Sequence, residues 1–115
     1  MPTYLVERYL PRTTPELLAA SALRALQAAE RMSAAGTPVR YLHSIYLPRD
    51  EMWFCLFEAG SAHAVAESNE VAGIPYERIT EAIHLDAESL LRLDRAAMTR
   101  PSPVGEEREG GPQCQ

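Results

Sequence analysis

Apolar residues are densest in one short stretch near the middle of the chain, residues 52–58 (Met-Trp-Phe-Cys-Leu-Phe-Glu). Both alternating sets of positions are apolar there, whereas a strand with one face in water would alternate between apolar and polar residues. Turn residues bound the stretch, with Pro48 and Asp50 before it and Gly60 after it. We interpret it as a central strand covered on both faces. A chain of 115 residues can cover one face with its own helices, so we expect the second face to need another subunit.

Three further segments are rich in β-branched and aromatic residues, which are typical of strands. In the first of them, alternation places Tyr4, Val6 and Arg8 on one face of the sheet and Glu7 on the other. In the last, Glu81 shares its parity with apolar residues and His84 lies on the opposite face. The predicted strands are residues 3–10, 39–47 and 76–85.

Three segments predict helices by their caps and by apolar spacing. Thr14 and Pro15 are typical of a helix start, and Gly36 is typical of a helix end. Ser61 and Asp86 supply the same capping chemistry for two later helices. The predicted helices are residues 15–35, 62–72 and 87–98. In the first, the apolar stripe at 3–4 spacing is Leu18, Ala22, Leu26 and Ala29.

The order of elements is strand, helix, strand, strand, helix, strand, followed by a terminal helix. This order predicts an α+β fold of the ferredoxin-like kind, in which two helices cover one face of a four-stranded antiparallel sheet. Because the central strand keeps its second face apolar, we expect two sheets to pack face to face as a dimeric α+β barrel. Residues 1–98 form the predicted domain. Residues 99–115 are rich in Pro, Gly, Glu and Ser, and predict a disordered tail.

Charge and composition narrow the functional classes. The net charge of −5 and the lack of a basic cluster argue against nucleic-acid binding. No apolar run reaches the roughly 18 residues of a membrane span, and the charged residues in 1–8 argue against a signal peptide. We therefore expect a cytoplasmic protein without nucleic-acid or membrane partners. Cys55 and Cys114 are not expected to pair, and Cys55 is predicted to be a small buried apolar residue.

The candidate chemistry lies in ionisable residues within the predicted strands. The sequence holds none of the phosphate-binding, dinucleotide-binding, zinc-protease or serine-hydrolase motifs. Carboxylates and imidazoles converging from neighbouring strands suit a divalent first-row metal such as nickel, zinc or non-haem iron. Tyr9, Ser44 and Tyr46 are candidates for orienting such ligands. The candidate metal ligands are Glu7, His43, Glu58 and His84, with Glu81 second to them.

Each candidate also has an ordinary structural interpretation. A histidine within a strand is more often a hydrogen-bonded structural residue than a ligand. Glu7 can form an edge charge or a salt bridge between subunits, and Glu58 can cap the loop that follows its strand. The residues alone leave these alternatives open.

Four short motifs carry a resemblance to a known family. They are residues 4–8 with Leu10-Pro11, residues 42–46, residues 54–59, and Gly73-Ile74-Pro75 before residues 78–81. Together they resemble the small nickel-binding, nickel-responsive dimeric α+β barrel proteins, long catalogued as a domain of unknown function. The resemblance covers residues 2–86. It implies a cytoplasmic homodimer that binds nickel through oxygen and imidazole donors.

Three functional hypotheses follow. The first is a homodimer that binds nickel or another divalent metal, buffering or sensing it rather than catalysing a reaction. The second is a small dimeric-barrel enzyme, such as a cofactor-free monooxygenase or an isomerase. There His43 or His84 would be the general base beside Glu7 or Glu58, and an apolar pocket would be lined by Tyr9, Phe54 and Tyr46. The third is a scaffold module whose barrel is only an interface, which leaves the strand carboxylates unexplained.

Overall fold

The computed structural model describes residues 1–98, which form two units. The first unit, Met1–Ile83, holds the sheet and two helices, and the second begins at His84 and holds one helix. The elements are β1 (Thr3–Tyr9), α1 (Pro15–Ala34), β2 (Val39–Leu47), β3 (Met52–Ala59), α2 (Ala62–Ala72), β4 (Arg78–Ala82) and α3 (Ala87–Met98). None of the helices among residues 1–98 is long and apolar enough to cross a membrane.

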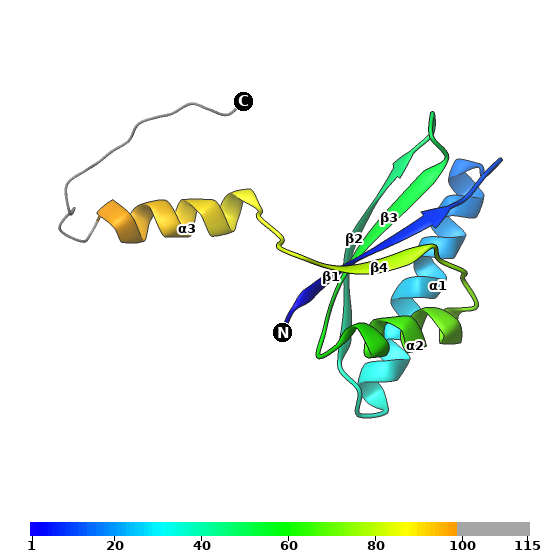
Figure 1. Cartoon of the computed structure of the whole chain (residues 1–115), viewed down its shortest axis with the longest axis horizontal. Coiled ribbons are helices and arrows are strands. Elements are labelled where there is room, and N and C mark those ends of the chain that lie inside the picture. The colour runs from blue at the N-terminus through cyan, green and yellow to red at the C-terminus, as the bar shows by residue number, and fades with distance from the viewer. Residues whose placement is uncertain (99–115) are drawn as a thin grey trace. The chain divides into compact units, whose positions relative to one another are not determined.

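The sheet has the strand order β2-β3-β1-β4, and every neighbouring pair is antiparallel. Val6 of β1 lies opposite Cys55 of β3 and Ile79 of β4, which defines the register of β1 with both of its neighbours. α1 and α2 both lie against the same face of this sheet (Figure 1). The predicted ferredoxin-like α+β arrangement of strands and helices is therefore confirmed.

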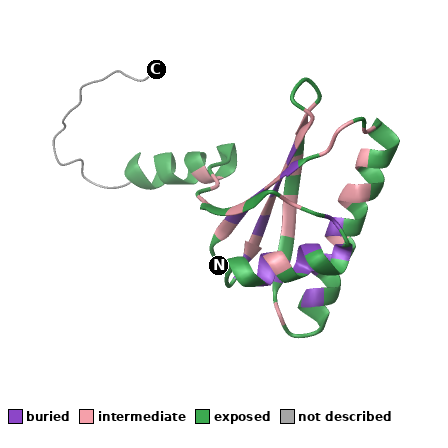
Figure 2. Cartoon of the chain, turned by 45° about the vertical axis from the view of Figure 1, so that its right-hand side comes forward, coloured by how far each residue is buried: buried purple, intermediate pink, exposed green. Residues whose placement is uncertain are grey.

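The core lies between the sheet and its two helices (Figure 2). Along β1 and β3 the buried residues alternate, and Trp53 and Phe57 are the largest apolar ones. Cys55 is fully buried between them, as predicted. The face covered by the helices is the one that alternation assigns to Tyr4, Val6 and Arg8, and all three are buried.

α1 begins and packs as its sequence dictates, but its buried stripe differs from the predicted one. The Thr14 hydroxyl accepts a hydrogen bond from the Leu17 N–H (3.1 Å), so the predicted cap is confirmed. Of the predicted stripe only Ala29 is buried, while Leu18, Ala22 and Leu26 stay partly exposed. Small side chains let the helix approach the sheet closely, so the side with most alanines faces the core. The buried residues are Ala25, Ala28, Ala29 and Met32.

α2 matches the predicted bounds. The Ser61 hydroxyl accepts a hydrogen bond from the Ala64 N–H (3.2 Å) at its start. Gly73 ends the helix with a left-handed backbone (φ 72°), the conformation that favours glycine at this position.

β4 is shorter than predicted, because its partner strand ends. The prediction of a strand over residues 76–85 is wrong at both ends: β4 covers Arg78–Ala82. Ala82 lies opposite Thr3, the first residue of β1. The residue before Thr3 is Pro2, which has no N–H to continue the ladder. His84, predicted to lie in this strand, therefore belongs to the second unit.

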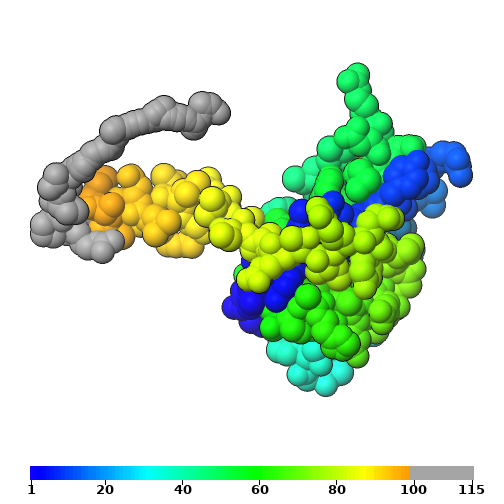
Figure 3. Space-filling view, viewed as in Figure 1, coloured from blue at the N-terminus to red at the C-terminus, as the bar shows by residue number. Residues whose placement is uncertain are grey.

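β2 contains an irregularity that changes which side chains share a face. Tyr41 lies opposite Phe57 and His43 lies opposite Leu56, so two steps on β2 match one step on β3 and Leu42 is the extra residue. Before this bulge Tyr41 faces the helices; after it, His43 faces away from them. The turn that joins β2 to β3 projects from the first unit as a narrow ridge (Figure 3).

α3 has the predicted bounds, Ala87–Met98. The Ser89 N–H donates a hydrogen bond to the Asp86 carboxylate (2.7 Å), which caps the first turn. Glu88 and Arg92 form an ion pair one turn apart (3.5 Å). No side chain of α3 is buried. The predicted disordered tail and Cys114 lie outside the described residues.

Candidate metal-binding face of the sheet

The side of the sheet that faces away from α1 and α2, here called the uncovered face, is largely apolar. Its apolar side chains come from β1, β2 and β3. Phe54 and Leu56 are only partly buried, and Ile45 is 60% exposed. The apolar residues of this face are Leu5, Tyr9, Ile45, Leu47, Met52, Phe54 and Leu56.

Glu7 lies on the uncovered face between Phe54 and Arg78, its register partners on β3 and β4. Its carboxylate is bound by Arg78 through two nitrogens, Nε at 2.8 Å and Nη2 at 2.7 Å. The Glu7 side chain is only 17% exposed, although that of Arg78 is 67% exposed. Within one chain, Glu7 therefore forms its salt bridge with Arg78 of the neighbouring strand, whereas the sequence suggested a bridge between subunits.

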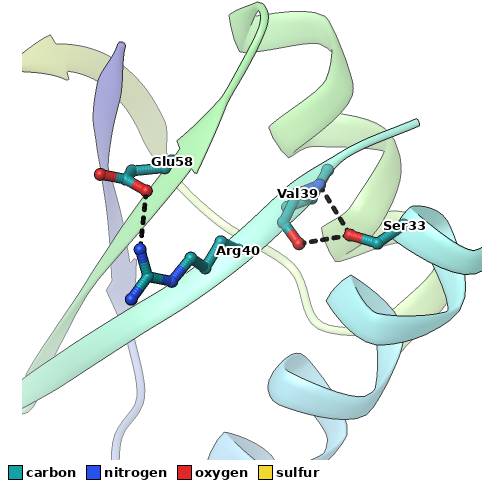
Figure 4. Close-up of polar contacts among 4 residues, drawn as sticks. All are labelled: Ser33, Val39, Arg40 and Glu58. Atoms are coloured by element: carbon teal, nitrogen blue, oxygen red, sulfur yellow. Dashed lines mark hydrogen bonds and ion pairs between the residues drawn. The ribbon is translucent and has the colours of Figure 1, made fainter. Parts of the chain in front are cut away.

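Glu58 lies on the same face of β3, opposite Arg40 of β2 and Thr3 of β1. Arg40 Nη1 approaches Glu58 Oε1 at 3.2 Å (Figure 4). Both side chains are open to water, 71% for Arg40 and 31% for Glu58, so the ion pair is weak. The Glu58 carboxylate can therefore exchange Arg40 for another positively charged partner.

The start of β2 is held to α1 by a side chain on the other side of the strand. The Ser33 hydroxyl accepts from the Val39 N–H (3.0 Å) and donates to the Val39 carbonyl (2.9 Å) (Figure 4). This double hydrogen bond holds the backbone of Val39 in place. It thereby also fixes the position of the next residue, Arg40, along the strand relative to Glu58.

His43 is exposed on the uncovered face, opposite Leu56. Glu58 is two residues further along β3 and on the same face as Leu56, so it is the diagonal neighbour of His43. Diagonal neighbours in an antiparallel pair have Cα atoms about 7–8 Å apart, within reach of long side chains. His43 and Glu58 are therefore the predicted ligands that the sheet brings nearest to one another.

The other predicted ligands are not brought to this place. Glu81 lies opposite Tyr4, on the helix side of β4, where its side chain is exposed at the sheet edge. His84 follows the end of β4 and is not part of the sheet. Glu7 is displaced along the strands: its register partner Phe54 is four residues from Glu58, roughly 13 Å.

The three predicted orienting residues divide between the two faces. Tyr9 lies on the uncovered face and donates a hydrogen bond to Glu51 (3.4 Å). Ser44 and Tyr46 lie on the helix side, opposite Cys55 and Trp53. The Tyr46 hydroxyl donates to the Leu10 carbonyl (2.9 Å). The pocket suggested for an enzyme is therefore divided, because Tyr46 and Phe54 lie on opposite faces.

One chain alone does not offer a complete metal site. Among residues 1–98, no three His, Cys, Asp or Glu side chains lie close enough together to hold an ion. The imidazole and carboxylate chemistry suits nickel, but a single chain supplies at most the pair His43 and Glu58 at one place. A nickel site at this place would therefore need donors from outside the single chain.

A polar network inside the core was not predicted from the sequence. Tyr41 and Ser44 hydrogen-bond through their hydroxyls, and the Ser44 hydroxyl donates to Cys55 Sγ (3.1 Å). Arg8 reaches the same sulfur from the other side (3.5 Å). Burial raises the pKa of the Tyr41 phenol above its usual 10.0, while the hydrogen bond to Ser44 acts in the opposite direction. The sequence feature that could have indicated this network is Arg8, because alternation places it on the same face of the sheet as Tyr4 and Val6.

The sheet with two helices on one side and carboxylates and a histidine on the other defines a ferredoxin-like α+β protein with one open sheet face. The family model described as nickel responsive protein SCO4226-like matches residues 4–82, and the chain belongs to this family. The family predicted from the four short motifs is thereby confirmed.

The fold is also similar to that of a solved structure. The crystal structure of SCO4226 from Streptomyces coelicolor A3(2) matches with a TM-score of 0.63 at 20% identity. The match covers 73% of this chain and 99% of the other one. At this level of identity the likeness concerns the fold alone. A search of curated proteins finds none that matches this chain.

Proposed function

We propose that this protein binds nickel as a homodimer and buffers or senses the metal rather than catalysing a reaction. The observation that carries the proposal is the placement of His43 and Glu58 as diagonal neighbours on the uncovered face. Membership of a family named for its response to nickel supports the choice of metal. Both donors also belong to the types that nickel accepts in proteins.

A second copy supplies the donors that one chain lacks. In a two-fold symmetric dimer every residue of the interface occurs twice. If the uncovered faces meet with the two-fold axis beside His43 and Glu58, two imidazoles and two carboxylates come together, which is enough for a first-row divalent ion with water completing the coordination. The apolar residues around them favour this contact, because burying them removes their surface from water.

Glu58 and Glu7 differ in how readily each can bind a metal, because their arginine partners hold them with different strength. The Arg40–Glu58 pair is exposed, and such pairs contribute only about 0–1 kcal/mol, so a metal displaces Arg40 at little cost. Glu7 is far less exposed and is held by two nitrogens of Arg78. We therefore propose His43 and Glu58 as the ligands and Glu7 as part of an inter-strand ion pair.

The test uses purified protein without a polyhistidine tag, because such a tag binds nickel itself. Elemental analysis gives the metal content, nickel titration calorimetry gives the affinity, and sedimentation gives the oligomeric state. We expect about one nickel ion per dimer and at least tenfold weaker binding for His43→Ala and for Glu58→Gln.

A matched control is Glu81→Gln, which removes a strand carboxylate from the helix side of the sheet. It should bind nickel like the wild type. A dimer that gives no heat with nickel, or variants at His43 and Glu58 with unchanged affinity, contradicts the proposal. Weakened binding by Glu7→Gln alone would return the ligand role to Glu7.

A further inference from the structure

The hydroxyls of Tyr41 and Ser44 meet across the bulge of β2. Both side chains point to the face of the sheet that α1 and α2 cover, because they lie opposite buried residues of β3, Phe57 and Cys55. The two hydroxyls are hydrogen-bonded to one another. The extra residue Leu42 lies between them in the sequence. This hydrogen bond therefore spans the irregular part of the strand.

A regular strand does not permit this hydrogen bond. Side chains alternate between the two faces of a strand, so residues three positions apart point to opposite sides. Tyr41 and Ser44 are three positions apart, and the extra residue Leu42 places them on the same side. The bond can form only in the bulged arrangement, and it therefore stabilises that arrangement relative to plain alternation.

The same bulge creates the candidate metal-binding pair on the uncovered face. Arg40 and His43 are also three positions apart, yet both face away from the helices, opposite Glu58 and Leu56. Without the bulge, Arg40 and His43 would lie on opposite faces of the sheet. His43 would then not be a diagonal neighbour of Glu58. The hydroxyl bond on one face and the placement of the imidazole on the other thus depend on one irregularity.

Both sides of the bulge are also held to β3 on the covered face. The Tyr41 ring packs edge-on against the Phe57 ring, with the ring centres 5.5 Å apart and the ring planes at 90°. The Ser44 hydroxyl donates to Cys55 Sγ at 3.1 Å, and Arg8 Nη2 approaches the same sulfur at 3.5 Å. We call Tyr41 and Ser44, with the hydrogen bond between them, the bulge clamp.

The donors within the bulge clamp follow from the number of hydrogens. The Ser44 hydroxyl has one hydrogen, which it donates to Cys55. The bond between the two hydroxyls therefore uses the hydrogen of Tyr41 and a lone pair of Ser44. Burial raises the pKa of the Tyr41 phenol, so this hydrogen is retained at neutral pH. Tyr41→Phe removes the donor of the clamp, and Ser44→Ala removes its acceptor together with the bond to Cys55.

We propose that Tyr41 and Ser44 are positioning residues for His43, because the bond between their hydroxyls fixes the bulge that holds the imidazole on the uncovered face. The inference rests on the proposed function, since it concerns the same metal site. It also changes the role predicted for Ser44 from the sequence. Ser44 lies on the face opposite to that of His43 and acts on it through the backbone rather than by contact.

The test compares four single substitutions in the full chain. Tyr41→Phe and Ser44→Ala each break the bulge clamp. Ser44→Thr keeps a hydroxyl on a residue type that suits strands and should restore the clamp. Tyr46→Phe is the matched control, because it removes a phenol hydroxyl from the same side of β2 whose partner, the Leu10 carbonyl at 2.9 Å, lies outside the bulge. Trp53 fluorescence verifies that each variant is folded.

The first measurement needs no metal. Side chains directly opposite one another have Cβ atoms about 4.5–5.5 Å apart, so the Leu56 methyl groups report on the presence of His43. NMR relaxation dispersion on these methyl groups gives the population of a state in which His43 has left this place. We expect that population to rise about three- to tenfold in Tyr41→Phe and Ser44→Ala, the range that one lost hydrogen bond accounts for. Ser44→Thr and Tyr46→Phe should behave like the wild type.

The second measurement is nickel titration calorimetry on the same proteins. Because the imidazole is less well oriented without the bulge clamp, Tyr41→Phe and Ser44→Ala should bind nickel about tenfold more weakly, as when a group that orients a metal ligand is removed. Ser44→Thr and Tyr46→Phe should keep the wild-type affinity. Weaker nickel binding in the clamp variants that Ser44→Thr does not share identifies the hydroxyl as the group that acts.

Several outcomes overturn the proposal. One is an unchanged Leu56 signal in both clamp variants, and another is an effect of Tyr46→Phe as large as theirs. Weaker nickel binding without a change at Leu56 also contradicts it, and so does wild-type affinity in variants whose Leu56 signal has changed. If the NMR result is as expected and the wild type binds no nickel, the bulge clamp still positions His43 and only the metal function fails.

Discussion

The guanidinium of Arg8 and the side-chain amide of Asn69 meet inside the core, with Arg8 Nη2 donating to Asn69 Oδ1 at 2.6 Å. Arg8 is 1% exposed, has no carboxylate partner among residues 1–98, and lies over the Trp53 ring with its central carbon 4.6 Å from the ring centre. Its Nε is a buried donor without a hydrogen-bond partner in the described chain. A buried cation is costly unless dipoles and ring faces stabilise it, so Asn69 carries much of that task.

We therefore expect Asn69→Ala to lower the free energy of unfolding by about 1–3 kcal/mol, because it leaves a buried donor unsatisfied. Urea denaturation followed by Trp53 fluorescence measures the loss. Glu67→Ala, an exposed change on the same helix, serves as control and should cost far less. Equal effects of the two substitutions would show that Asn69 does not support Arg8. In a double-mutant cycle with Arg8→Met, the two effects should not add.

The left-handed backbone at Gly73 predicts a cost for a single added methyl group. A Cβ there meets no atom within 4 Å, so Gly73→Ala introduces backbone strain without a clash. We expect a loss of about 1 kcal/mol in thermal or urea unfolding. Gly60→Ala is the matched control, since it is equally open and has no left-handed φ. If both variants have the same stability, φ strain is not what selects glycine at the end of α2.

Alkaline pH should destabilise the fold through Tyr41. Burial is the largest cause of its raised pKa, so the folded state favours the neutral phenol. This stabilisation is fully present below the unfolded value of about 10 and is lost as pH rises through the higher folded value. Tyr41→Phe should therefore lose stability less steeply above pH 10 than the wild type. Tyr46, whose pKa is also raised, is present in both proteins and cancels in the comparison. Parallel stability curves would contradict the prediction.

Acidic pH should loosen the start of α3. The hydrogen bond from the Ser89 N–H lowers the pKa of the Asp86 carboxyl below its usual 3.8. Because the pKa is lower in the folded state, the ionised carboxylate stabilises the fold at pH values above the unfolded pKa of about 3.8. This contribution disappears as the pH falls from there through the folded pKa. Amide chemical shifts of residues 87–90 should report fraying in that range, and Asp86→Ala should show it already at neutral pH. Asp94→Asn, within the same helix, should not.

Most of the fold could be predicted because its signals are local. Thr14, Ser61 and Gly73 mark helix ends by their own chemistry. The bounds of α2, α3 and β2 were predicted correctly from such local signals. The errors arose where distant residues decide. Pro2 limits β4 from the neighbouring strand, and the close approach of α1 to the sheet selects alanines over the leucines of its predicted stripe.

The candidate site was less predictable for the same reason. Parity correctly placed Glu7 on the face opposite to that of Arg8, but it does not indicate which residues of other strands lie beside a carboxylate. Arg78 and Arg40, which occupy the two carboxylates, are recognised only once the register is known. His84 was assigned to a strand that ends before it.

The bulge at Leu42 makes the facing of the second half of β2 depend on a count of residues rather than on their kinds. Deleting Leu42 would remove the extra residue and leave His43 opposite Leu56 and Ser44 opposite Cys55, each on the side that it now occupies. If β2 kept Leu42 but paired without a bulge, His43 would instead lie among the aromatic residues under α1, and Ser44 and Tyr46 would lie on the surface side. The bulge therefore lets β2 carry one residue more than its partner strand and still display its imidazole.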